Sequence, residues 1–192
     1  NVFKGIVSKL SMTFQNQKKT FLTKSDRSKK GGIDEKCIPL INSINKMENY
    51  YTTSSCSGRV YFWRGSGKKN EMEWINVSHD LITPDFFTIE DTSGTIWLRL
   101  EGFILHVACR NLDVANAFLK EAQKVYKRSS ILSATNKIVV EVRGPEIIEM
   151  PFYEDSILVY SGDVETLRAL LNSKMEQIEA GIQRFKHILE TI

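Results

Sequence analysis

The sequence predicts an α+β fold in which a mixed or antiparallel sheet has helices flanking it. Apolar residues recur at helical spacing in several stretches, alternate as in strands in others, and form one long seam before the C-terminus. A chain of 192 residues can bury a substantial core, so we expect a single α+β domain over residues 1–192. The glycine-rich turn of a Rossmann fold, GxGxxG after a strand, does not occur in the sequence.

The composition indicates which partners and which cellular environment the protein can have. The formal net charge of +3 is too small to indicate a polyanionic partner by itself. The three cysteines are widely spaced and odd in number, which favours a reducing, cytoplasmic environment over a disulfide framework. No apolar run approaches the roughly 20 residues of a membrane helix, so we expect no membrane partner.

The first part of the chain predicts two helices with a basic connection between them. Residues 12–23 and 34–49 carry apolar side chains at helical spacing, and Pro39 must lie near the first turn of the second helix. The connection, residues 25–32, is rich in lysine and ends in two glycines. Charge patterning favours a solvated loop there, and contact with phosphate groups is the alternative.

Residues 50–64, YYTTSSCSGRVYFWR, concentrate small hydroxyls, a thiol, a glycine and an arginine in front of a strand. Gly58 permits a turn that other residues resist, and the strand after it places Arg59, Tyr61 and Trp63 on one face. An arginine among aromatic rings is typical of surfaces on which unpaired bases stack. Packing beneath the C-terminal helix is the alternative, which the pattern alone favours.

The next residues predict a hairpin. The aromatic strand would turn at the glycine- and lysine-rich residues 65–70 and pair with residues 72–77. A short helix is expected within residues 85–90.

In residues 95–110, TIWLRLEGFILHVACR, the apolar positions change from even to odd at Gly102. One strand with a bulge at Gly102 would explain the change, since one extra residue turns every later side chain to the other face. The bulged strand would place the side chains of Trp97, Arg99 and Glu101 on the face of His106 and Arg110. Two separate strands are an alternative of equal weight, and they would break that alignment.

The remaining residues predict one helix, four strands and a final long helix. Asp113 would cap a helix that ends near Tyr126. The expected strands are residues 130–133, 137–143, 146–151 and 156–160. The apolar seam of residues 163–192 fits a helix packed along a sheet, with a coiled-coil dimer as a lesser alternative, so we expect a monomer or a weak homodimer. A faint similarity between residues 13–100 and 101–192 predicts two pseudo-repeat halves.

Cys56 with His79 or His106 would supply the nucleophile and base of a Cys/His-dependent hydrolase or transferase. The flanking glycines of a nucleophile elbow are missing, so the sequence favours a cysteine that only lines a pocket. His106 and Cys109 would point to opposite faces of a strand, and no other spacing is typical of metal ligands. We therefore expect no metal site.

Several of these motifs together resemble the tRNA wybutosine-synthesizing protein 3 family, from near Phe14 to about Pro151. The string SSCSGR at residues 54–59 is the most specific part of the resemblance. The other matching positions add order and spacing; they are Asp26, Ser28, Lys30, Gly31, Asp34, His79, residues 97–99, His106 and Arg110.

The resemblance implies an S-adenosylmethionine-dependent methyltransferase that acts on tRNA(Phe), with a fold other than the Rossmann type. In this family the enzyme methylates the N4 nitrogen of the tricyclic, wyosine-type guanosine just 3′ of the anticodon. The implied partner is therefore the anticodon stem-loop of tRNA(Phe). Such a transfer requires nitrogen, methyl group and sulfur to be aligned, and a base can remove the nitrogen's proton. A tRNA-binding module for the anticodon loop, without catalysis, is the alternative.

Residue chemistry assigns roles to the positions that match the family. The predicted cofactor-binding residues are Ser54, Ser55, Ser57, Gly58 and Arg59, and Cys56 lines the same pocket. The predicted substrate-binding residues are Ser28, Lys30, Asp34, Tyr61, Trp97, Arg99 and Arg110. The predicted catalytic residues are His79, His106 and Asp26, and a histidine is the favoured proton acceptor because it titrates near neutral pH.

Overall fold

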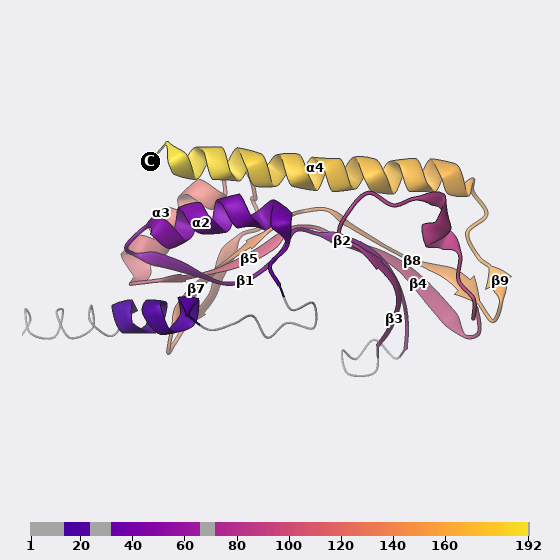
Figure 1. Cartoon of the computed structure of the whole chain (residues 1–192), viewed down its shortest axis with the longest axis horizontal. Coiled ribbons are helices and arrows are strands. Elements are labelled where there is room, and N and C mark those ends of the chain that lie inside the picture. The colour runs from indigo at the N-terminus through magenta and orange to yellow at the C-terminus, as the bar shows by residue number, and fades with distance from the viewer. Residues whose placement is uncertain (1–13, 24–31, 66–71, 192) are drawn as a thin grey trace, which may run out of the picture. The chain divides into compact units, whose positions relative to one another are not determined.

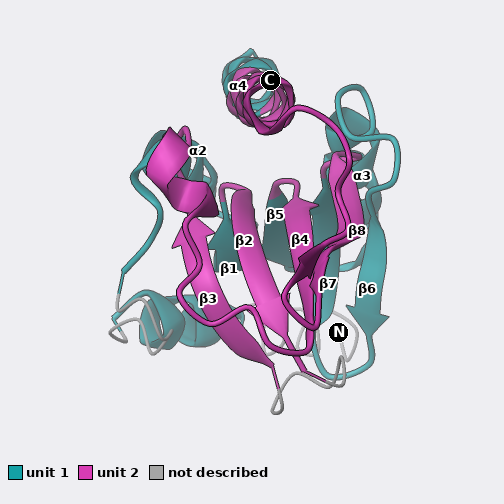
Figure 2. Cartoon of the chain, turned by 90° about the vertical axis from the view of Figure 1, so that its right-hand side faces the viewer, with its two compact units in different colours: residues 1–56, 104–143, 182–192 teal, residues 57–103, 144–181 magenta. Residues whose placement is uncertain are grey.

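The computed structural model describes residues 14–23, 32–65 and 72–191. The predicted α+β class is confirmed, with antiparallel sheets, flanking helices and a long C-terminal helix (Figure 1). The chain divides into two compact units, each with one sheet (Figure 2). Unit 1 comprises residues 1–56, 104–143 and 182–192, and unit 2 comprises residues 57–103 and 144–181. The predicted duplication of residues 13–100 and 101–192 stays a prediction.

Unit 1 contains a four-stranded antiparallel sheet in the order β1-β5-β7-β6. Its strands are β1 (Tyr50–Cys56), β5 (Ile104–Cys109), β7 (Ile138–Arg143) and β6 (Ser130–Ala134). The odd positions of β5, Leu105, Val107 and Cys109, are buried. Since side chains alternate along a strand, the even positions of β5 belong to the opposite face of the sheet.

The helices of unit 1 begin at residues that suit a helix N-terminus. The short helix η1 (Glu35–Cys37) leads into α2 (Ile38–Lys46), and Pro39 stands in its first turn, where a missing N–H costs nothing. Helix α3 (Leu112–Ala122) is capped by Asn111, whose Oδ1 accepts the Val114 N–H at 2.9 Å. The predicted Asp113 cap is wrong, because the helix starts before that residue, which lies in its first turn.

A helix at residues 14–22 packs on the even face of β5. The rings of Phe14 and Phe21 lie 5.4 and 5.5 Å from the ring of Tyr51, which is buried together with Ala108. Ala108 and His106 are two residues apart on β5, so the packed helix and His106 share one face of the sheet.

Unit 2 contains a five-stranded antiparallel sheet in the order β3-β2-β4-β8-β9. Its strands are β2 (Arg59–Arg64), β3 (Glu73–Ser78), β4 (Thr95–Glu101), β8 (Ile147–Glu154) and β9 (Ile157–Leu158). The predicted β2–β3 hairpin is confirmed. Phe62 is fully buried against Phe152 and against Phe86 and Phe87 of the short helix η2 (Pro84–Phe87), so this face of the sheet carries the core of unit 2.

The interpretation of residues 95–110 as one bulged strand is wrong. Strands β4 and β5 are separate and belong to different sheets. Between them, the Phe103 carbonyl accepts the Gly144 N–H at 2.8 Å, and a Cβ on Gly102 would lie 3.0 Å from the Glu146 carbonyl oxygen. Residues 102–103, which connect β4 to β5, thus lie against residues 144–146, which connect β7 to β8. The change in apolar parity therefore marks a change of sheet.

Helix α4 (Val164–Glu190) confirms the predicted C-terminal helix. Its buried residues follow the predicted seam: Leu167, Leu171, Met175, Ile178, Ile182, Phe185 and Leu189. In unit 2 the Asn172 side chain holds the backbone of Ile82, accepting its N–H at 2.8 Å and donating to its carbonyl at 3.0 Å. In unit 1 the Phe185 ring contacts Phe118 of α3. Within the described residues, no helix has the length and apolar character to cross a membrane.

Candidate functional site

The SSCSGR string lies where the chain passes from β1 to β2. Residues 54–56 end β1, Arg59 begins β2, and only Ser57 and Gly58 connect the strands. Gly58 has a φ of +93°, and a Cβ there would lie 3.1 Å from the Glu101 carbonyl oxygen and 3.2 Å from Ile178. Both the backbone conformation and the lack of space require glycine at this position.

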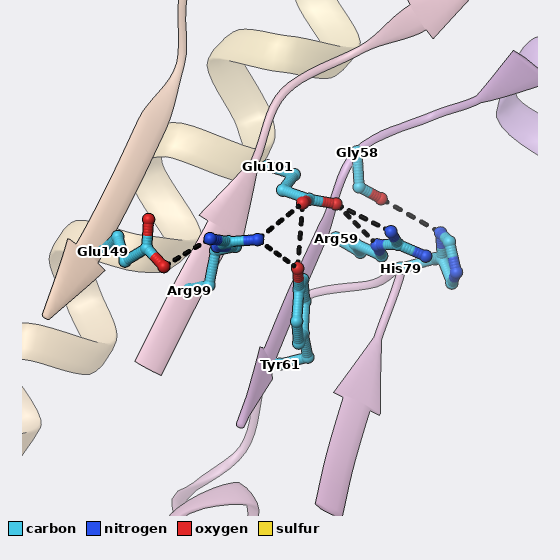
Figure 3. A network of polar contacts seen from close by, with 7 residues as sticks. All are labelled: Gly58, Arg59, Tyr61, His79, Arg99, Glu101 and Glu149. Atoms are coloured by element: carbon cyan, nitrogen blue, oxygen red, sulfur yellow. Dashed lines mark hydrogen bonds and ion pairs between the residues drawn. The ribbon is translucent and has the colours of Figure 1, made fainter. Parts of the chain in front are cut away.

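His79 is attached to this connection in unit 2. Its Nδ1 donates to the Gly58 carbonyl at 3.0 Å, because a carbonyl oxygen can only accept (Figure 3). The acceptor of the neutral ring is then Nε2, so the backbone of the string fixes the tautomer of this predicted catalytic histidine.

Glu101 is the centre of a polar network (Figure 3). The network lies on the face of the unit 2 sheet opposite to Phe62, which we call the outer face. Its Oε2 accepts from Arg59 Nε at 2.9 Å and Nη2 at 2.7 Å, and its Oε1 accepts from the Tyr61 hydroxyl at 2.8 Å. Arg99 donates to the Tyr61 oxygen at 3.2 Å and pairs with Glu149 on β8. Two guanidinium groups and two carboxylates therefore balance in charge, and the network orders Arg59 and Arg99.

The network changes the titration of its members. Burial raises the pKa of Tyr61 to about 12, and the neighbouring carboxylate of Glu101 adds to this rise while Arg99 opposes it. Burial acts to raise the pKa of Glu101, but the Arg59 charge and the hydrogen bonds from Tyr61 and Arg59 hold it below its usual value. At neutral pH the network therefore contains a phenol and a carboxylate.

Aromatic rings lie beside this network. The rings of Tyr61 and Trp74 stack with centroids 5.2 Å apart, and those of Trp63 and Trp97 stack at 5.9 Å. Tyr61 and Trp63 are buried, whereas Trp74 is 42% exposed. Arg59, Tyr61 and Trp63 therefore share one face of the sheet, as predicted. The ring that is exposed to solvent on this face belongs to Trp74.

Unit 1 contains a second polar arrangement. Ser54 pairs with His106 across β1 and β5, and His106 pairs with Glu141 across β5 and β7, so the three side chains form one row. Ser54 Oγ lies 2.8 Å from His106 Nδ1, and His106 Nε2 lies 2.9 Å from Glu141 Oε2. A histidine between a hydroxyl and a carboxylate is the arrangement that proton-transfer sites use.

The other predicted residues of unit 1 lie at its loops and strand ends. Asp34 is buried immediately before η1, and Arg110 Nη1 contacts Asn49 Oδ1 at 3.3 Å and Glu48 Oε1 at 3.7 Å. Ser55 and Cys56 lie at the end of β1. Asp26, Ser28 and Lys30 lie outside the described residues. The assigned roles of all these residues stay predictions.

The sequence that forms these two polar arrangements matches a known protein family. The model of the family described as methyltransferase TYW3 matches residues 14–191, which include both polar arrangements. The chain belongs to this family. The predicted resemblance is thereby confirmed, and the protein is a methyltransferase.

Relatives extend the match to this family over nearly the whole chain. The tRNA wybutosine-synthesizing protein 3 homolog of Xenopus laevis is 33% identical over 186 residues, which cover 92% of this chain and 74% of the relative. The tRNA(Phe) 7-((3-amino-3-carboxypropyl)-4-demethylwyosine(37)-N(4))-methyltransferase of Methanocaldococcus jannaschii is 30% identical over 187 residues, which cover 93% and 97% of the two chains. The solved PH1069 protein from Pyrococcus horikoshii has a TM-score of 0.82 at 28% identity and covers 94% of this chain and 97% of its own.

Four residues of these TYW3-family arrangements were not among the predicted site residues. Glu101, Glu149 and Glu141 complete the two polar arrangements, and Trp74 supplies the exposed ring. Each is recognisable only by its partner on a neighbouring strand, 35 residues away for the pair of His106 and Glu141. The only sequence signal for Glu141 is a carboxylate at a central position of a strand that is otherwise apolar up to Arg143.

Proposed function

We propose that this protein methylates the N4 nitrogen of the tricyclic modified guanosine that lies 3′ of the anticodon in tRNA(Phe). The observation that supports the proposal is the match to the TYW3 family over residues 14–191. The name of the Methanocaldococcus jannaschii relative states this nitrogen and this tRNA, and the chain covers 97% of that relative. The reaction belongs to the biosynthesis of wybutosine and related bases.

S-adenosylmethionine is the proposed methyl donor. The chemistry of the SSCSGR string fits its polar parts, since serine hydroxyls and backbone groups can bind ribose hydroxyls and an amino-acid moiety. Gly58 is assigned with them because it makes the tight connection between Ser57 and Arg59, where no side chain fits. We assign donor binding to Ser54, Ser55, Ser57, Gly58 and Arg59, with Cys56 lining the pocket.

The partner that we propose is the anticodon stem-loop of tRNA(Phe). Support comes from the outer face of the unit 2 sheet, where Trp74 is exposed over Arg59 and Tyr61. Aromatic rings and guanidinium groups on a sheet are the elements that proteins use to stack unpaired bases. Trp97 and Arg99 extend the same row of residues toward β8. None of the three cysteines forms a disulfide, which supports a cytoplasmic location.

A methyl-transfer assay tests the proposal directly. The substrate is tRNA(Phe) that carries the demethylated tricyclic base, and the product is identified by mass spectrometry of its nucleosides. We expect one added methyl group, dependent on S-adenosylmethionine, and micromolar-scale binding of the donor in calorimetry. Binding of tRNA without methyl transfer would instead favour the alternative of a non-catalytic module that binds the anticodon loop.

The Cys/His hypothesis is tested in the same assay. Replacement of Cys56 by alanine is expected to preserve methyl transfer if the thiol only lines the pocket. Complete loss of activity in a folded Cys56→Ala protein would support covalent catalysis by this residue.

A further inference from the structure

The row of Ser54, His106 and Glu141 has a fixed direction of hydrogen bonding. An ionised carboxylate can only accept, so the proton between His106 and Glu141 is carried by Nε2. In the neutral imidazole, Nδ1 is then the acceptor, and the Ser54 hydroxyl donates to it at 2.8 Å. All three groups thus have defined roles before any substrate binds.

Exposure decreases along the row in the same direction. Ser54 is exposed, the side chain of His106 is 25% exposed, and that of Glu141 is 17% exposed. A substrate can therefore reach the hydroxyl, whereas the carboxylate is partly shielded from water. An ion pair in such a place is less screened than one on the surface, so Glu141 stabilises a positive charge on the ring more effectively.

The ladder holds these residues in place. The register pairs Ser54 with His106 and His106 with Glu141, and the Thr53 hydroxyl donates to the His106 carbonyl at 3.3 Å. All three residues lie within strands, which position functional groups better than loops do. Polar side chains that merely share one face of a sheet need not all donate their hydrogen bonds in the same direction, whereas Ser54 and His106 do.

We propose that this row is the proton acceptor of the methyl-transfer reaction, with Glu141 as a positioning residue that acts through His106. The proposal rests on the proposed function. The substrate nitrogen forms the new N–C bond with its electron pair, and the sulfur of the donor keeps the pair of the broken S–C bond. The nitrogen's proton passes to Ser54 Oγ while the Ser54 proton passes to His106 Nδ1, so the ring becomes an imidazolium paired with Glu141.

Enzyme kinetics test the positioning role of Glu141. Glu141→Gln preserves shape but removes the charge, and Glu141→Ala removes the contact; both are expected to lower kcat by about tenfold or more, since general base catalysis contributes roughly 10²–10⁴. The KM for tRNA should stay within about twofold, because Glu141 touches no substrate in this scheme. Glu154→Ala, which removes an exposed glutamate at the end of β8, is the control and should leave both constants unchanged. An unchanged kcat in folded Glu141→Gln protein would overturn the proposal.

Nitrogen NMR of the histidine rings gives a readout that needs no substrate. In the wild-type protein, neutral His106 should carry its proton on Nε2 and none on Nδ1, and the Nε2 proton should be slow to exchange with water. The Glu141→Ala variant should lose this protected proton, and Ser54→Ala should retain it. A proton on Nδ1 in the wild-type protein would exclude the relay.

The two measurements separate the possible failures. If the wild-type protein transfers no methyl group but the ring has the expected tautomer, the proposed function fails while the hydrogen-bonded row stands. If methyl transfer occurs and the Glu141 variants retain full kcat, the relay fails while the proposed function stands.

Discussion

The guanidinium carbon of Arg59 lies 4.3 Å from the centroid of the Trp74 ring. The same guanidinium is held from the other strand by Glu101, with Nη2 2.7 Å from Oε2. Arg59 therefore connects an exposed ring on β3 to a half-buried carboxylate on β4. Because the stack of Arg59, Tyr61 and Trp74 is ordered without a ligand, a base that stacks on Trp74 would meet a ring whose rotamer is already set.

Removal of the Trp74 ring should weaken binding of the anticodon loop. Stacking on an aromatic side chain contributes about 1–3 kcal/mol per base, so Trp74→Ala should raise the Kd by roughly 5- to 150-fold. Trp74→Phe retains a ring and should lose less. Fluorescence anisotropy with a labelled stem-loop measures both, and an equal Kd for the wild-type and alanine proteins would remove Trp74 from the RNA surface.

Glu101 should contribute more to stability than a comparable surface carboxylate. Glu101→Ala leaves two arginines and the hydroxyl of the buried Tyr61 without their shared acceptor, which we expect to lower the free energy of unfolding by about 2–3 kcal/mol. The control is Glu73→Ala, which breaks the pair with Arg64 at a glutamate that is 60% exposed and should change stability little. Urea unfolding measures the loss in free energy of unfolding for both variants. An equal loss in the two would show that the hydrogen bonds of Glu101 are worth no more than those of an exposed ion pair.

Tyr61 should make stability fall at alkaline pH. Its pKa is raised by burial to about 12 in the folded protein, against about 10 when unfolded, so the native state keeps the proton longer. The stabilisation is complete below pH 10 and is lost as the pH rises toward 12. Tyr61→Phe keeps the ring but cannot ionise, so its free energy of unfolding should fall less steeply over this range. Parallel slopes for the two proteins, measured by urea unfolding between pH 9 and 11, would contradict the assignment.

Gly58 should tolerate no side chain. Alanine there would need a φ of +93° and would press its Cβ against the Glu101 carbonyl and Ile178, at an expected cost of about 1–3 kcal/mol. Gly32→Ala is the matched control, because a Cβ on Gly32 would meet no atom within 4 Å. Thermal unfolding should show a clear decrease in Tm only for the Gly58 variant. A Gly58→Ala protein as stable as the control would mean that the connection between β1 and β2 rearranges easily.

The secondary structure could largely be predicted because its signals are local. The seam of residues 163–192 and the alternation of residues 59–64 are repeated over several turns or pairs, and the structure has α4 and β2 in those places. The cap of α3 was misplaced by two residues, since Asn111 and Asp113 are both good capping residues and the sequence does not state which one precedes the first turn.

Sheet membership could not be predicted, because it depends on pairing between distant segments. Gly102 gave the same parity change that a bulge gives, although the chain there leaves one sheet for another. For the same reason Glu141 could not be predicted as a site residue, since its role depends on its register with His106 on the neighbouring strand. The pattern favoured packing of the face of Arg59, Tyr61 and Trp63 beneath the C-terminal helix. Tyr61 is buried, but the side chains that contact its ring are Trp74 from another strand and Arg59 from its own, and these contacts could not be predicted.

The division of the chain into units has a consequence for synthesis. Unit 1 uses residues 1–56, 104–143 and 182–192, and unit 2 uses residues 57–103 and 144–181, so both wait for parts of α4. A ribosome releases the N-terminal residues first, yet neither unit has all of its segments until residues of α4 have been made. Folding of both units during translation is therefore expected to finish only after α4 has left the ribosome, and a chain that stops before residue 164 would leave both units incomplete.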